Sequence, residues 1–156
     1  MNSEKRETLG DYSSIVCLKA IITGMEDALG DKTTAIALIA AGRLRGKQIA
    51  DQLKLTEADG GLDHITQLVA AALGKDGTRL LILDKIEQTD TSYRAYTKET
   101  VCSAGELEGS ERICTFSLGA VQGVLEAVTG KRYRGQQIES VLRGGSHDVF
   151  EYTPIN

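Results

Sequence analysis

Apolar side chains recur every three or four residues in the first half of the chain, which is the period of an α-helix packed on one face. The first such stretch begins at Ile15 and is followed by Gly30, a residue type that commonly ends helices. A second stretch runs to Leu53, and a third begins at Asp63, an N-capping residue type, and stops before Gly74. The pattern therefore predicts helices over residues 15–29, 33–53 and 63–73.

The period changes after Gly77. Residues 79–87 are largely apolar, as in a buried strand, and residues 93–101 alternate between apolar and polar. A second strand pair is predicted over residues 133–142 and 149–152, joined by a turn at Gly144 and Gly145. We therefore expect an α+β fold in which about four helices cover one side of a four-stranded antiparallel sheet.

A fourth helix is predicted between the two strand pairs, starting at about Cys114, and it is apolar on most sides. A helix of this kind is normally sandwiched between other elements. Gly119 and Gly123 lie four residues apart on it, so one face is open to another backbone or a flat ligand. Gly42 and Gly46 repeat the spacing in the second predicted helix. We expect these glycines to serve close helix contacts, between the two helices or between two copies of the chain.

Composition indicates an ordinary globular domain. The chain has 156 residues, 41% of them hydrophobic and 26% charged, which suits one domain over residues 12–156 after a flexible lead-in at 1–11. A net charge of −4 argues against nucleic-acid binding. We expect no transmembrane segment, because no apolar run approaches the roughly 18 residues that a membrane span needs. The polar start is unlike a secretory signal, and three cysteines without a framework spacing favour free thiols and a cytoplasmic location.

The residues that could carry chemistry are scattered singly. Cys17, Cys102, Cys114, His64 and His147 show no paired metal-ligand spacing, so we predict no metal site. The histidines are best interpreted as surface or capping residues. Cys114 fits a small core residue, or alternatively a reactive thiol at a helix start. No nucleophile elbow, phosphate loop or dinucleotide fingerprint occurs, and no catalytic residue is predicted.

The C-terminal third carries a recognisable order of residues. This order is Cys114, Phe116, Gly119, Gly123, Glu139, Gly144 and Phe150. It resembles the 4-vinyl reductase, or hydrocarbon-binding, domain family, which shares its fold with the transport-protein-particle (TRAPP) small subunits. The segment 41–46 resembles that family's first glycine-bearing helix. The family's last two cysteines fall at Val141 and Val149 here, so the resemblance does not imply a cysteine-based metal site.

The resemblance implies a homodimer formed through helices and a hydrophobic channel. Its occupant would be a small apolar or tetrapyrrole-like molecule, as in photosynthesis-related relatives, or an acyl chain on a cysteine. Cys17 and Cys114 are the candidates for acylation.

Three functions stay open at this point. The first is a non-enzymatic module that binds a small hydrophobic ligand. Its expected lining is Phe116, Val121, Leu125, Tyr93 and Tyr96, each of which also fits ordinary core packing. The second is a scaffold or assembly factor that docks a protein partner through its helices without a ligand. The third is an enzyme of tetrapyrrole metabolism, which the missing cofactor motifs disfavour.

Overall fold

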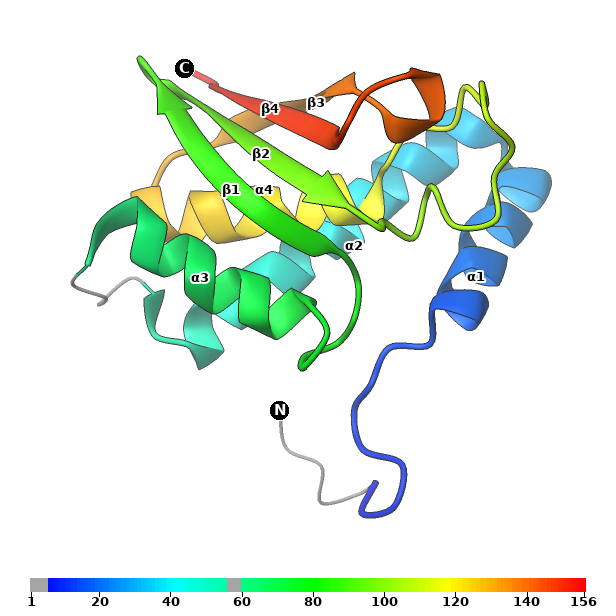
Figure 1. Ribbon diagram of the computed structural model, residues 1–156, viewed down its shortest axis with the longest axis horizontal. Coiled ribbons are helices and arrows are strands. Elements are labelled where there is room, and N and C mark those ends of the chain that lie inside the picture. The colour runs from blue at the N-terminus through cyan, green and yellow to red at the C-terminus, as the bar shows by residue number, and fades with distance from the viewer. Residues whose placement is uncertain (1–5, 56–59) are drawn as a thin grey trace.

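The computed structural model describes residues 6–55 and 60–156, so the first part of the expected lead-in lies outside the described residues. Within these residues the chain forms four α-helices and one four-stranded sheet (Figure 1). The elements are α1 (Ile15–Leu29), α2 (Asp31–Gln52), α3 (Gly61–Leu73), β1 (Ile82–Thr89), β2 (Ser92–Lys98), α4 (Phe116–Thr129), β3 (Tyr133–Glu139), the short 3-10 helix η2 (Val141–Arg143) and β4 (Asp148–Pro154). The predicted α+β class and order of elements are confirmed.

Local signals account for the ends of these helices. The Ser14 side chain accepts a hydrogen bond from the Cys17 backbone N–H and so caps the start of α1. Gly30 stands at the other end of α1, where its N–H donates to the Glu26 carbonyl. Gly130 ends α4 in the left-handed conformation that glycine adopts without strain. The sequence signals therefore located the boundaries of α1 to the residue.

The sheet is antiparallel throughout, with strand order β1-β2-β4-β3. β1 and β2 form a hairpin, and β4 pairs with both β2 and β3, so that Ala95 lies opposite Phe150. Both of these side chains are fully buried, as is Tyr152, whose hydroxyl donates to the Leu118 carbonyl of α4. Helices therefore cover this face of the sheet, while the other face carries charged residues such as Arg94, which pairs with Glu151.

α4 lies between the sheet and α2 (Figure 1), and its residues 117–126 are all buried. Four glycines let α2 and α4 approach closely. A Cβ at Gly46 would lie 2.0 Å from the Ala120 carbonyl oxygen, and one at Gly123 would lie 2.2 Å from the Arg43 carbonyl oxygen. Gly42 and Gly119 meet backbone oxygens at similar distances, 2.2 and 2.3 Å. The glycine faces are thus occupied within one chain. The expectation that they form a dimer contact is wrong, because they are buried against each other.

Candidate functional site

The connection from β2 to α4, residues 99–115, has no helix or strand and runs past the end of the sheet toward α1 (Figure 1). A disulfide joins Cys102 to Cys114 across it, and both cysteines are buried. The expectation of three free thiols is therefore wrong for this pair; only Cys17, which is exposed, is a free cysteine. Acylation of Cys114 is excluded in this state, because the disulfide occupies its sulfur. The cysteine count no longer argues for a reducing compartment, so a cytoplasmic location stays a prediction.

Buried polar groups surround the disulfide. Thr100 Oγ1 lies 3.0 Å from Cys102 Sγ and donates to Asp148 Oδ2 at 2.7 Å. The other carboxylate oxygen of Asp148 accepts from the Val141 N–H at 3.0 Å and from the side chain of Gln137 at 3.2 Å. These bonds satisfy a carboxylate that is 1% exposed and tie three parts of the chain together at the disulfide.

Three of the side chains around the disulfide are of types that bind metal ions. Ligand atoms of Cys102, Cys114 and Asp148 lie within 4.8 Å of one another, so the two cysteines are not isolated from acidic groups as the sequence suggested. The chain pairs the sulfurs with each other, and a disulfide sulfur is not the thiolate that binds metals. The two cysteines can therefore either form a disulfide or, as thiolates, bind a metal ion together with Asp148. The structure contains the disulfide.

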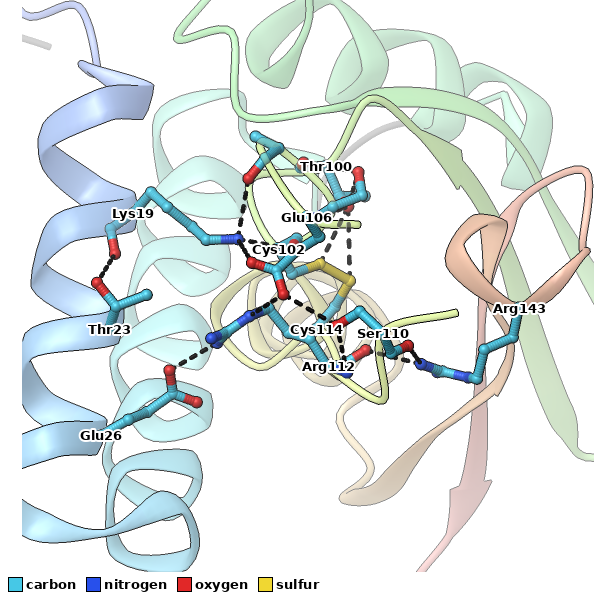
Figure 2. Close-up of polar contacts among 12 residues, drawn as sticks. Lys19, Thr23, Glu26, Thr100, Cys102, Glu106, Ser110, Arg112, Cys114 and Arg143 are labelled. Atoms are coloured by element: carbon cyan, nitrogen blue, oxygen red, sulfur yellow. Dashed lines mark hydrogen bonds and ion pairs between the residues drawn. A yellow bond between two sulfur atoms is a disulfide. The ribbon is translucent and has the colours of Figure 1, made fainter. Parts of the chain in front are cut away.

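An ion-pair network ties the connection to α1 (Figure 2). Lys19 lies 2.9 Å from Glu106 and also donates to the Cys102 and Ala104 carbonyls at 2.9 and 3.0 Å. Arg112 lies 2.6 Å from Glu26 and 3.1 Å from Glu106. The hydrogen bond from Lys19 is the main cause that lowers the pKa of Glu106 to about 2. Glu106 is therefore ionised at neutral pH.

A cavity of about 540 Å³ lies between α1, α2 and the connection. Its lining comprises Thr23, Glu26 and Asp27 of α1; Asp31, Thr34, Ala35 and Leu38 of α2; and Glu106, Ser110, Glu111, Arg112, Ile113 and Thr115. Thr34 is 1% exposed, and its hydroxyl has no hydrogen-bond partner among the described residues. Most buried hydroxyls are satisfied, so an unpaired one on the wall of a cavity indicates a place where a bound molecule can supply the bond.

Four of the five residues expected to line a channel, Phe116, Val121, Leu125 and Tyr93, belong to or pack against one hydrophobic core, and Tyr96 lies outside it. Val121 and Leu125 are 0% and 1% exposed, in the core. Phe116 is half-buried at the start of α4, and Tyr93 meets the Tyr133 ring edge-on at 5.8 Å on the helix-covered side of the sheet. None of these residues lines the cavity described above.

Tyr96 lies on the opposite face of the sheet from Tyr93, because the two are three positions apart along β2 and side chains alternate between the faces. Its hydroxyl donates to Glu87 at 2.9 Å, and Lys85 lies 4.3 Å from the ring centre. A single lining formed by all five expected residues is therefore wrong.

The residues that line the cavity could not be predicted from the sequence, because most of them are ordinary polar residues on three separate segments. Glu26, Glu106 and Arg112 share no motif, and an odd number of cysteines, at positions 17, 102 and 114, does not suggest a disulfide framework. The one available signal was that Cys102 and Cys114 bracket a glycine-containing polar connection between two predicted elements. That arrangement can be closed by a disulfide only if the fold brings its ends together.

Comparisons with known proteins identify relatives of the fold. No family model matches the chain, and no curated protein matches it in sequence. The phenol-responsive sensory domain of the transcription activator PoxR, solved with phenol, superposes with a TM-score of 0.71 at 14% identity, covering 92% of this chain and 76% of that one. A trafficking protein particle complex subunit 3 from Naegleria fowleri, covalently bound to palmitic acid, superposes with a TM-score of 0.58 at 14% identity, covering 91% of this chain and 93% of that one. The chain thus has the fold that these two proteins share.

Among the described residues, no helix combines the length and apolar character needed to cross a bilayer.

Proposed function

We propose that this chain is a non-enzymatic binding module that holds a small ligand in the cavity between α1, α2 and residues 99–115. The observation that carries the proposal is the unpaired, buried hydroxyl of Thr34 on the wall of that cavity. Two proteins of the same fold, a sensory domain solved with phenol and a trafficking protein particle subunit covalently bound to palmitic acid, support it. The motif order around Cys114 also supports a distant relation to the 4-vinyl reductase family.

The size and lining of the cavity favour a compact ligand. A volume of about 540 Å³ lies within the roughly 300–1,000 Å³ of typical ligand pockets. Ala35, Leu38 and Ile113 offer apolar contact, and Thr34 offers one hydrogen bond. The lining also includes the carboxylates of Glu26, Asp27, Asp31, Glu106 and Glu111, which disfavour an anionic ligand, and Arg112 is already paired with two of them. The ligand that fits has an apolar body and one polar group, as phenol does. A tetrapyrrole, the larger ligand suggested by the family resemblance, would require the connection to move outward.

Native mass spectrometry of freshly purified protein, with a denaturing mass on the same sample, tests for a retained ligand. Non-covalent extra mass would support the module and identify its ligand. Covalent extra mass that maps to Cys17 would instead show acylation at the exposed cysteine.

A titration with phenol locates the site. Ala35→Trp should abolish phenol binding, because Ala35 lines the cavity and the indole fills it. Ala37→Trp on the same helix is the matched control, since Ala37 is exposed and does not line the cavity, and it should bind phenol normally. Phenol binding that survives Ala35→Trp, or protein that binds no phenol and carries no extra mass, would refute the proposal.

The scaffold hypothesis has one observation in its favour. α2 carries an apolar face on which Ile36 and Leu44 are 66% and 61% exposed. We propose that a second copy of the chain covers this face, in place of the glycine contact that the fold rules out. Light scattering should show a dimer that Leu44→Glu dissociates and that Lys131→Glu, a charge change at an exposed residue outside α2, leaves intact. A dimer without ligand or phenol binding would favour the scaffold, and a monomeric wild type would refute dimerisation.

A further inference from the structure

The disulfide and one wall of the proposed cavity belong to the same short segment. Cys102 and Cys114 stand 12 residues apart, and the residues between them include Glu106, Ser110, Glu111, Arg112 and Ile113, all of which line the cavity. We propose that the disulfide is a redox switch on ligand binding: its reduction loosens this wall and lowers the occupancy of the cavity. The proposal rests on the binding function proposed above and adds its regulation.

No regular secondary structure holds the segment in place. Its backbone forms short-range turn bonds, such as Glu106 N–H to the Ser103 carbonyl at 3.2 Å, and one bond to a distant segment, from the Gly109 N–H to the Leu142 carbonyl at 2.6 Å. Leu107, at its centre, is 84% exposed and so contributes almost no burial. A region with few buried apolar contacts and solvent-exposed backbone opens at low free-energy cost.

The remaining anchors are polar side-chain contacts. Arg143 donates to the Ser110 carbonyl at 2.7 Å, and the Lys19–Glu106 and Arg112–Glu26 pairs reach across to α1. Each of these contacts is non-covalent, so each can break while the others hold. The covalent bond between the ends of the segment is therefore its strongest constraint, because it removes most of the conformations that a free loop of this length explores.

The chemistry needs a dithiol reductant. One reductant thiolate attacks a sulfur of the Cys102–Cys114 bond and forms a mixed disulfide; the second thiol then closes on its partner and releases the protein. The S–S bond of the protein breaks and one forms in the reductant, while two electrons and two protons pass to the cysteines. Both cysteines are buried, so the reductant reaches them only when the segment opens. A bound ligand that packs against Ile113 and Arg112 should therefore slow the reduction.

The test compares oxidised full-length protein with protein reduced by dithiothreitol. Amide hydrogen exchange over residues 103–113 should accelerate roughly tenfold or more on reduction, while α2 and α4 stay protected. The phenol dissociation constant should rise in parallel. The Cys102→Ser/Cys114→Ser variant should match reduced protein without reductant, and Cys17→Ser, which removes the exposed thiol, should behave as wild type.

The outcomes separate the switch from the binding function. Equal exchange over 103–113 in both states overturns the switch, even if phenol binds. Equal phenol affinity in both states overturns it as well. Failure of phenol to bind in either state counts against the binding function, and the exchange rates then still decide whether the disulfide controls the segment. Purified protein whose two cysteines hold a metal ion and no disulfide also overturns the switch.

Discussion

The close contact between α2 and α4 predicts how Gly46→Ala changes the free energy of unfolding. Backbone distances decide whether the change stabilises or destabilises the protein. Gly46 lies in the middle of α2, where replacing glycine by alanine ordinarily stabilises a helix by about 1 kcal/mol. A Cβ there would lie 2.0 Å from the Ala120 carbonyl oxygen and 2.8 Å from the Val124 nitrogen, both backbone atoms of α4. Neither atom can move without shifting the whole helix, so Gly46→Ala must push α2 and α4 apart.

The expected cost exceeds the gain in helix propensity. Overpacking a well-packed contact costs about 1–3 kcal/mol, and this site is at the upper end because a buried helix has to move. We expect Gly46→Ala to lower the free energy of unfolding by about 2 kcal/mol net, after the propensity gain is subtracted. For a chain of this size such a loss lowers the melting temperature by about 4–8 °C.

Gly24 provides the matched control. It lies in the interior of α1, and a Cβ there would meet nothing within 4 Å. Gly24→Ala should therefore raise the free energy of unfolding by about 1 kcal/mol. Urea unfolding followed by far-ultraviolet circular dichroism measures both variants. If Gly46→Ala stabilises the protein as Gly24→Ala does, the close approach of α2 and α4 is wrong.

Three further predictions concern the site and the core. Replacing both Cys102 and Cys114 by serine should lower the free energy of unfolding by about 3 kcal/mol, as expected for a loop closed across 12 residues, and an unchanged urea midpoint would contradict this. The pKa of Glu106 is lowered from 4.5 to about 2, so its stabilising contribution is complete above pH 4.5 and is lost as the pH falls toward 2. Unfolding free energies measured across that window should decline less steeply for Glu106→Gln, and identical slopes would refute the assignment. Tyr152→Phe removes a buried 2.7 Å hydrogen bond to the Leu118 carbonyl and should cost about 1–3 kcal/mol in urea unfolding; a neutral effect would show that the carbonyl finds another donor.

The hydrophobic pattern located the secondary structure because local periodicity and capping residues act over a few positions. The prediction of α1 matched the observed helix, and the glycine pattern in the second and fourth helices pointed to their packing against each other. The predicted dimer contact through the same glycines was wrong. The spacing of glycines shows that a helix can be approached closely, but it does not show whether the approaching helix belongs to the same chain or to a second copy. Tyr93 and Tyr96 were assigned to one lining although their odd spacing along the predicted strand already places them on opposite sides of the sheet.

The pairing of the cysteines lay beyond local reasoning. Cys102 comes after β2, and Cys114 comes just before α4. Whether their sulfurs meet depends on where β2 ends relative to the start of α4. Asp148 reaches the same spot from β4, more than 30 residues further on. The cavity likewise exists only because α1, α2 and the connection leave space between them, and a void has no signature in the identity of any one residue.

The sequence by itself determined the α+β class, the order of helices and strands, and the glycine positions that permit close helix packing, because these follow from local periodicity and backbone freedom. Only the tertiary structure decided which glycine faces meet, which cysteines pair and where a ligand has room. Those features arise where segments distant along the chain converge, and their convergence is set by the packing of the whole core.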